Sequence, residues 1–248
     1  MRRAIRKSAE LFVECFEPDS PVVEMGSRYL EGWQWLCDLR PLFPNHEFAG
    51  CDVRPGLGVD RIEDAQAMAR DDGSVATMLM FEVLEHVPHP EKALREVRRV
   101  LRPDGLLAMS VPCNYRLHGF PDDYRRLTPS GVHIWLEGFA EKAVFGLGPR
   151  VKPAFVFAVA TPRKSEEFLR RKAMFQARVV ETFRASLLRG WVSAMKERGR
   201  DLLGCLLGRA DLGVAFYEPE SDRSRDPENL GPSGARPEAP QAEKVDRP

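Results

Sequence analysis

Short, continuously apolar runs alternate with helical patterns through the first two thirds of the chain, and this alternation constrains its fold most. Such runs are typical of strands that are covered on both faces of a sheet. Right-handed crossovers between them give a Rossmann-like, doubly wound α/β sheet, mostly parallel, with helices on both faces. The expected strands are Val22–Met25, Glu47–Cys51, Val75–Phe81, Leu106–Val111, Ala143–Leu147 and Ala154–Ala160.

Two helical patterns lie between the expected strands. Pro90–Leu101 begins at a proline, which the first turn of a helix tolerates, and Gly105 then marks a turn into the next strand. The other expected helix is Glu31–Leu42, with an apolar face formed by Trp35, Leu36 and Leu39.

Composition divides the chain of 248 residues into three parts. Residues 1–162 carry the strand and helix alternation and are expected to form the Rossmann-like domain. Residues 163–216 are basic and amphipathic, and they predict a helical arm after it. Residues 217–248 are rich in Pro, Gly, Ser and charge, with almost no apolar side chains to bury. Because burial cannot offset the entropy of ordering such a segment, we expect a disordered tail.

Charge and cysteine usage exclude several classes of protein. Lys+Arg and Asp+Glu are equal at 37 each, whereas a general nucleic-acid binder needs a surplus of cations. No apolar run approaches the roughly 20 residues that span a bilayer, and no secretory signal is visible. The five cysteines show no CxxC or zinc-like spacing, which predicts reduced, mostly buried thiols. We therefore expect a cytoplasmic protein with no nucleic-acid partner.

The arm holds twelve Lys/Arg residues against five Asp/Glu between positions 163 and 209. Its apolar residues recur at helical spacing, which predicts a helix that is packed on the domain or on a second subunit as a homodimer. A basic amphipathic helix resting on an anionic membrane surface is the alternative. The stripe consists of Phe175, Val179, Phe183, Leu187, Trp191 and Met195.

Polar residues stand at the ends of the first two expected strands. Glu24 lies two positions before Gly26, and Asp52 follows the second strand. Open α/β sheets bind ligands at the carboxyl ends of their strands, where Asp52 would accept hydrogen bonds from a ribose diol. A nicotinamide cofactor is disfavoured, because Arg28 stands where the second glycine of a G-x-G-x-x-G turn is needed. Glu24 suits a ligand with a cationic or hydroxyl end.

Residues 75–112 indicate which cofactor such a site would bind. They contain FEVLEHVPHPEKALREVRRVLRPDGLLAMSVP, which resembles the fourth strand and following helix of class I S-adenosylmethionine-dependent methyltransferases, in the type 11-like branch. Three further segments match a bacterial and archaeal branch of that family: EMGSRYLEG, GCDVRPGLGVDRIEDA and HGFPDDYRRLTP. The resemblance covers about residues 20–160. The departures are Asp104 in place of the first glycine of a PGG turn, Arg126 in place of a Trp-Arg pair, and the missing second glycine.

The resemblance implies a site for S-adenosylmethionine and its product S-adenosylhomocysteine. At the methionine end, Glu24 and Gly26 would shape the turn, with Ser27 and Arg28 beside it.

At the adenosine end, the resemblance implies four further contacts. Asp52 would hold the ribose hydroxyls and Val53 would pack beside the adenine. Asp64 would accept a hydrogen bond from the adenine amino group, with the Ala65 backbone nearby.

The tip of the fourth strand would face the transferred methyl through Phe81 and Glu82. Glu82, Glu85 and His86 have a spacing at which two carboxylates and an imidazole can ligate a hard cation. The same Leu-Glu-His sequence occurs widely in the resembled family without a metal, and His86 then bonds locally. We therefore expect an orienting role and assign no metal, with the cation as the alternative.

The loop after the fifth strand mixes aromatic, basic and acidic residues, as a pocket wall does. In the resembled family it meets the methyl acceptor. His118 is the candidate general base there, with His86 or Asp122 as alternatives. Methyl transfer from a sulfonium depends mainly on in-line positioning, so a base is needed only when the acceptor loses a proton.

The sequence thus predicts an S-adenosylmethionine-dependent methyltransferase. The expected acceptor is a small molecule or a glycan-like group, methylated at oxygen. The alternative is a non-catalytic cofactor-binding or scaffold protein that acts through its basic C-terminal helices.

Overall fold

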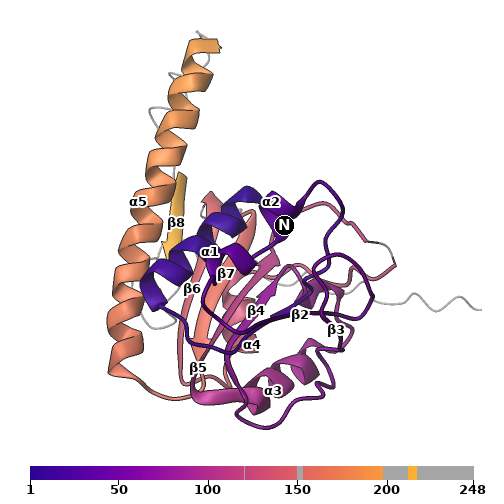
Figure 1. Cartoon of the computed structure of the whole chain (residues 1–248). Coiled ribbons are helices and arrows are strands. Elements are labelled where there is room, and N and C mark those ends of the chain that lie inside the picture. The colour runs from indigo at the N-terminus through magenta and orange to yellow at the C-terminus, as the bar shows by residue number, and fades with distance from the viewer. Residues whose placement is uncertain (120, 150–152, 198–211, 217–248) are drawn as a thin grey trace, which may run out of the picture. The chain divides into compact units, whose positions relative to one another are not determined.

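The computed structural model describes residues 1–119, 121–149, 153–197 and 212–216. Its centre is an eight-stranded sheet with the order β3-β2-β1-β4-β5-β7-β6-β8 (Figure 1). Strands β3, β2, β1, β4 and β5 pair in parallel, whereas β7 and β8 are antiparallel to their neighbours. The strands are β1 Val22–Met25, β2 Phe48–Asp52, β3 Arg61–Ile62, β4 Val75–Phe81, β5 Leu101–Pro112, β6 Glu141–Pro149, β7 Phe155–Thr161 and β8 Leu212–Phe216.

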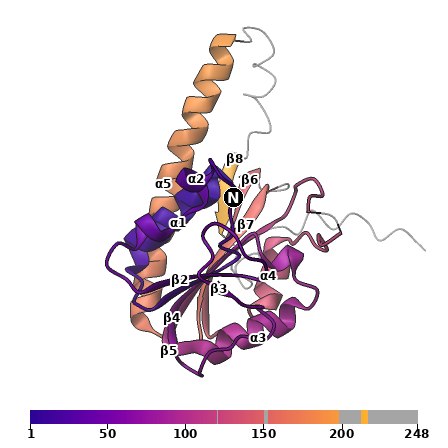
Figure 2. The ribbon, with the colours of Figure 1, turned by 45° about the vertical axis from the view of Figure 1, so that its right-hand side comes forward.

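Helices cover both faces of this sheet, so the predicted Rossmann-like, mostly parallel architecture is confirmed. In Figure 2, α1 and α5 lie on one side of the strands and α3 and α4 on the other. The α-helices are α1 Arg3–Phe16, α2 Gln34–Cys37, α3 Pro90–Val100, α4 Pro129–Trp135 and α5 Glu166–Glu197, and two 3-10 turns are η1 Arg40–Leu42 and η2 Leu84–His86.

Two apolar clusters form the core, one on each face. The first joins α3 and α4 to the sheet through residues such as Leu94, Val97 and Val132. The second joins α1 and α5 to the opposite face and is rich in phenylalanine. Strands β1, β4 and β7 are buried at every position. The four cysteines that the structure describes, Cys15, Cys37, Cys51 and Cys113, are free thiols.

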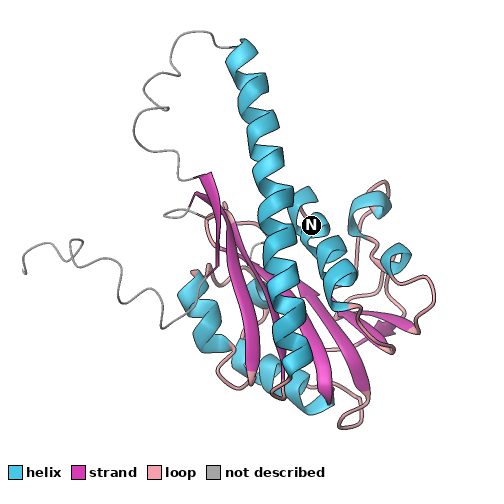
Figure 3. Cartoon of the chain, turned by 90° about the vertical axis from the view of Figure 1, so that its left-hand side faces the viewer, coloured by secondary structure: helices cyan, strands magenta, loops and turns pink. Residues whose placement is uncertain are grey.

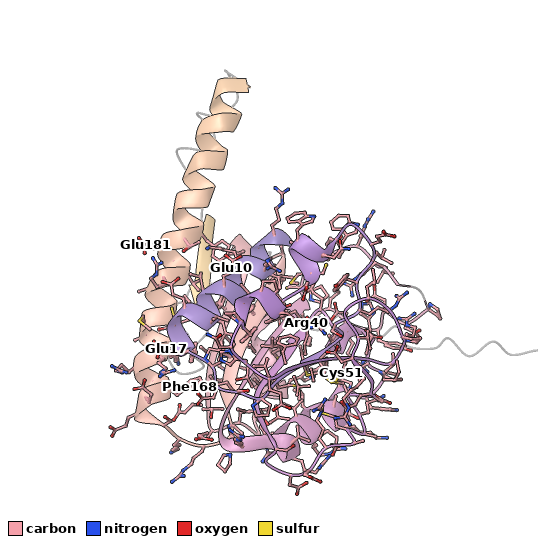
Figure 4. The ribbon with its side chains drawn as sticks, viewed as in Figure 1. Glu10, Glu17, Arg40, Cys51, Phe168 and Glu181 are labelled. Atoms are coloured by element: carbon pink, nitrogen blue, oxygen red, sulfur yellow. The ribbon has the colours of Figure 1, made fainter. Side chains whose placement is uncertain are left out.

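Helices α1 and α5 lie side by side over one face of the sheet (Figure 3). The Phe16 ring contacts Phe168 and Phe175 at centroid distances of 5.3 and 5.5 Å. Two ion pairs join the same helices: Arg178 pairs with Glu14 at 2.8 Å, and Arg171 pairs with Glu17 at 3.2 Å. Glu17 and Phe168 are labelled in Figure 4. Helix α5 is therefore part of the domain's core along its first half.

The predicted helix over Glu31–Leu42 is wrong in extent. The chain forms only α2 and the separate turn η1, with Asp38 between them in an extended conformation. Pro41 accounts for part of the break, because it lacks the N–H that a continuous helix would bond to the Cys37 carbonyl. Trp35 is 56% exposed and carries the Arg3 guanidinium over its ring, so it does not share the buried face of Leu36.

The strand that we expect at Leu106–Val111 is longer than predicted. Strand β5 begins at Leu101, directly after α3, and the four residues 102–105 form an irregularity inside it rather than a turn before it. Val75 pairs with Leu101, whereas Thr77 pairs with Leu106, so the insertion is absorbed as a bulge.

The predicted helical arm is helical only in part. Its last described segment, β8, pairs antiparallel with β6 and extends the sheet. Of the apolar stripe, Phe175, Val179 and Phe183 are buried against the domain. The rest of the stripe lies beyond the side chains that the structure describes, and the predicted tail, residues 217–248, lies outside the described residues. No described helix has the length and apolar character to cross a bilayer.

Substitution at Phe175 tests whether α5 belongs to the core. Phe175 is fully buried, and we expect Phe175→Ala to lower the free energy of unfolding by about 3–5 kcal/mol. Its neighbour Met174 is 46% exposed, so Met174→Ala should cost less than about 1 kcal/mol. Urea unfolding measures both. Equal effects of the two substitutions would contradict the packing of α5 on α1.

Candidate functional site

A cavity of ≈270 Å³ lies at the carboxyl ends of β1 and β4, on the edge where parallel sheets bind ligands. A cavity of ≈300 Å³ on the opposite edge contains Glu167 and Arg171, which already pair with each other. The ≈270 Å³ cavity is therefore the candidate site. Its wall is made by Met1, Arg2, Glu24, Gly26, Ser27, Arg28, Cys37, Phe81, Glu82, Tyr115 and His118.

The turn after β1 forms the floor of this cavity. Gly26 has a φ of +77°, and a Cβ at this position would lie 2.4 Å from Cγ2 of Val83. Glycine is therefore required both by the backbone conformation and by the space. The backbone N–H groups of Gly26 and Ser27 donate to the Cys51 carbonyl at 2.8 and 3.0 Å. These bonds fix the turn against the end of β2.

Glu24 brings a carboxyl group from the middle of the sheet into the cavity wall. It is only 5% exposed. Burial raises its pKa to about 8, and the Arg40 guanidinium opposes part of that shift. Arg40 itself is anchored by Asp60 at 2.6 Å and by the Gly58 carbonyl at 2.9 Å. The protonated form of Glu24 is favoured until a cationic group enters the cavity.

Arg28 lines the cavity and also contacts the loop after β2. Its Nε donates to the Pro55 carbonyl at 3.2 Å, and its side chain packs over Gly56. Arg28 thus joins the turn after β1 to the loop after β2. This contact accounts for an arginine at a position where a dinucleotide fold needs glycine.

The four residues predicted for the adenosine end lie outside the cavity wall. Asp52 ends β2, next to the turn, and Val53 is 57% exposed. Asp64 is exposed in the loop after β3, and Ala65 is buried beneath it. Each carboxylate accepts a hydrogen bond from the backbone N–H two residues later, at 2.9 and 2.8 Å. The structure therefore exposes Val53 and Asp64 and buries Ala65, and the contacts of all four residues with a cofactor remain predictions.

The end of β4 forms the opposite wall. Phe81 is 8% exposed and stacks on Phe157 with ring centroids 5.4 Å apart. Glu82 has a φ of +57°, which is uncommon for a residue with a side chain. Its carboxylate accepts a hydrogen bond from the Ser110 hydroxyl at 3.3 Å and pairs with Arg2 at 2.8 Å.

Arg2 is a site residue that the sequence reasoning missed. Its guanidinium lies 4.7 Å from the ring centroid of Tyr115 and 5.1 Å from that of Phe155. It reaches Glu82 across the cavity from a position just before α1. The basic start of the chain gave no sign of this role, because no motif surrounds it and the resemblance begins near residue 20.

A carboxyl group and two imidazoles gather beside the cavity. Glu85 in η2 is 1% exposed, and burial, reinforced by the charge of Glu82, raises its pKa to about 8. The next residue, His86, bonds through Nδ1 to the Asp122 carbonyl. The His86 and His118 rings meet edge to face at 5.0 Å.

His118 is oriented by its own acidic neighbour. Its backbone N–H donates to Asp123 Oδ2 at 2.6 Å, and its ring Nδ1 lies 3.3 Å from the same oxygen. Arg126 pairs with both oxygens of Asp123, at 2.5 and 2.7 Å, and holds the pKa of that carboxyl well below its usual range. Of the three candidate bases, only His118 lines the cavity. The Asp122 carboxylate accepts from the Tyr124 hydroxyl.

Comparison with known proteins bears on the family and the fold. A methyltransferase domain family model matches residues 48–109. A solved structure of 1,6-didemethyltoxoflavin-N1-methyltransferase from Burkholderia thailandensis, with bound S-adenosylhomocysteine, has the same fold with a TM-score of 0.50 and 15% identity; it covers 65% of this chain and 79% of that one. Residues 48–109 thus match a methyltransferase domain, and the fold around them is that of S-adenosylmethionine-dependent methyltransferases.

Two further comparisons set the extent of the likeness. The methyltransferase domain also resembles the CMeT domain of the citrinin polyketide synthase, with a TM-score of 0.52 and 17% identity over 65% of this chain and 52% of that one. An uncharacterized 37.1 kDa protein of a Streptomyces fradiae transposon is 45% identical over 58 residues. That match spans 23% of this chain and 16% of the relative.

The residues of the cavity fit S-adenosylmethionine, the cofactor of the family that residues 48–109 match. The turn at Gly26 leaves space that a Cβ would fill, and Glu24 places a buried carboxyl group in the same wall. Ser27 and Phe81 complete the wall on either side.

The raised pKa of Glu24 predicts how stability depends on pH. The folded protein holds this proton up to about pH 8, whereas an ordinary glutamate releases it near 4.5. Stability should therefore fall as the pH rises between these values, by at most about 1.4 kcal/mol per pH unit from this group. We expect Glu24→Gln to flatten the Tm against pH curve, with exposed Glu31→Gln as the control. A parent protein that gains stability from pH 5 to 8 would contradict this assignment.

Proposed function

We propose that this protein transfers a methyl group from S-adenosylmethionine to an oxygen of a small-molecule or glycan-like acceptor. The observation that carries the proposal is a single cavity with two different walls. Glu24 and Gly26 stand on the wall that suits the amino-acid end of the cofactor, and Tyr115 and His118 stand on the wall that an acceptor would meet.

Each wall has a chemical task in this proposal. The cofactor, when bound, supplies a methyl group on a cationic sulfur. Glu24 pairs with the ammonium group of the cofactor. A positive charge in this buried site lowers the pKa of Glu24, so the carboxyl group loses its proton when the cofactor binds. Asp52, at the end of β2, accepts from the ribose hydroxyls. Glu82 stands at the reacting end, where its negative charge favours a cationic sulfur.

The acceptor side supports oxygen as the methylated atom. An acceptor hydroxyl must lose its proton as it is methylated, and His118 is an imidazole in the cavity wall with its Nδ1 beside a carboxylate. A neutral His118 that donates Nδ1–H to Asp123 presents Nε2 as a proton acceptor. The same cavity of ≈270 Å³ must also take the amino-acid end of the cofactor, so the acceptor group that enters it is small.

Calorimetric titration with S-adenosylhomocysteine tests the cofactor site. Loss of a carboxylate that accepts two ribose hydrogen bonds costs about 2–3 kcal/mol, so Asp52→Ala should bind roughly 30- to 150-fold more weakly. Asp104→Ala is the matched control, because Asp104 is exposed in the bulge of β5, near the amino end of that strand and away from the carboxyl ends that hold the cavity. Equal affinity of parent and Asp52→Ala would contradict the proposed contact between Asp52 and the ribose hydroxyls.

Methyl transfer to a panel of hydroxyl and amine acceptors tests the reaction itself. We expect hydroxyl compounds to be methylated, and His118→Ala to lower kcat by about 10²–10⁴ while the cofactor affinity stays within twofold. Methylation of amines alone, unaffected by His118→Ala, would contradict the proposed oxygen chemistry. Tight cofactor binding without turnover on any acceptor would favour the non-catalytic scaffold.

A further inference from the structure

Glu85, His86 and His118 bring three ligand atoms together at one end of the cavity. One donor atom from each residue lies within 4.8 Å of the other two. Oε1 of Glu85 is 3.9 Å from Nε2 of His86. Glu85 and His86 come from η2 after β4, and His118 comes from the loop after β5, so two separate segments of the chain converge here.

The Glu85 carboxyl group has no hydrogen-bond partner within the part of the chain that the structure describes. Both of its oxygens are buried, and neither accepts or donates a hydrogen bond there. A buried carboxyl group left in this state costs free energy, and native proteins almost always satisfy such groups. A cation between Glu85 and the two imidazoles would give this buried carboxyl group a partner.

Both imidazoles are held as metal-ligating histidines usually are. In such sites one ring nitrogen donates to a carbonyl or carboxylate, which leaves the other nitrogen free for the metal. His86 contacts the Asp122 carbonyl through Nδ1 and turns Nε2 toward Glu85. His118 places Nδ1 beside the Asp123 carboxylate, which Arg126 keeps in position.

The nearby carboxylates are not available as further ligands. Glu82 is paired with Arg2 at 2.8 Å, and Asp123 is held by Arg126 at 2.5 Å. The donor set is therefore one carboxylate and two imidazoles, which differs from the two carboxylates and one imidazole that the sequence spacing alone offers. Imidazole-rich sets favour zinc and related transition ions over magnesium.

We propose that Glu85, His86 and His118 bind a divalent transition-metal ion, of the Zn²⁺ or Co²⁺ type, beside the acceptor pocket. Three protein ligands leave a fourth position open, as in catalytic zinc sites. His118 lines the cavity, so the open position is accessible to a small molecule in it.

The role of the ion rests on the proposed function, although its binding does not. An ion at this position lowers the pKa of an acceptor hydroxyl. The hydroxyl proton leaves to solvent, the oxygen forms a bond to the methyl carbon, and the bond from that carbon to sulfur breaks to leave the thioether. When the ion is bound, His118 acts as its ligand, and the general-base role proposed above applies to the protein without the ion.

Metal titration of the full-length, tag-free protein tests the site without cofactor or acceptor. After treatment with a chelator and its removal, we expect one equivalent of Zn²⁺ to bind by calorimetry. Co²⁺ should give a visible absorption spectrum of a four- or five-coordinate site without thiolate charge-transfer bands. His118→Ala and Glu85→Gln should each weaken binding at least 100-fold.

His89→Ala is the matched control, because His89 also lies within 3.5 Å of a glutamate but on an exposed surface. It should bind like the parent. Thermal melts identify a variant that fails to fold, and His118→Ala, in a surface loop, still reports if Glu85→Gln does not fold.

Absence of saturable binding to the parent, or equal binding to parent and His118→Ala, would overturn the proposal. Titration of the same samples with S-adenosylhomocysteine separates the two proposals. If the cofactor binds and the metal does not, only the proposed ion site is contradicted. If the metal binds and the cofactor does not, only the proposed methyl transfer is contradicted.

Discussion

Burial of β1 and β4 on both faces is the constraint on which the rest of the structure depends. Every residue of these two strands is enclosed between the α1 and α5 layer and the α3 and α4 layer. Polar side chains are costly in such strands, so the chemistry collects where the strands end. Glu24 is the exception within β1, and it is tolerated because its carboxyl group lines the cavity and favours the protonated form.

The charges around the cavity form a connected set. Glu82 and Glu85 lie three residues apart at the end of β4, and the charge of the first helps to keep the second protonated. Arg2 offsets Glu82 from the opposite side of the cavity. Because Arg2 immediately precedes α1, and α1 packs on α5, the helical layer on one face of the sheet positions a charged group in the site.

The sequence predicted the parts of the fold that depend on local pattern. Val22–Met25 and Val75–Phe81 are strands with the predicted bounds, because continuous apolar runs there meet both layers. The turn at Gly26 was predicted from its place after such a strand. The predicted helix over Glu31–Leu42 is wrong in extent, because the chain is extended at Asp38 and Pro41 lacks the N–H that a continuous helix needs. Helix α1 and strand β8 lie outside residues 20–160, so the family motifs in that range do not predict them.

The parts of the site that depend on pairing across the chain were beyond sequence reasoning. The spacing of Glu82, Glu85 and His86 suggested that they act together, whereas in the structure Glu82 pairs with Arg2, some 80 residues away in sequence. His118 joins the other two only because the loop after β5 folds back over η2. Such partners are chosen by tertiary packing, which no local pattern records.

A crystal structure with S-adenosylhomocysteine would show whether the carboxyl edge of the sheet is a cofactor site. We expect the amino-acid end of the ligand between Glu24 and Gly26, the ribose on Asp52, and the sulfur directed toward Glu82 and His118. Ligand density elsewhere, or a sulfur directed away from His118, would contradict it.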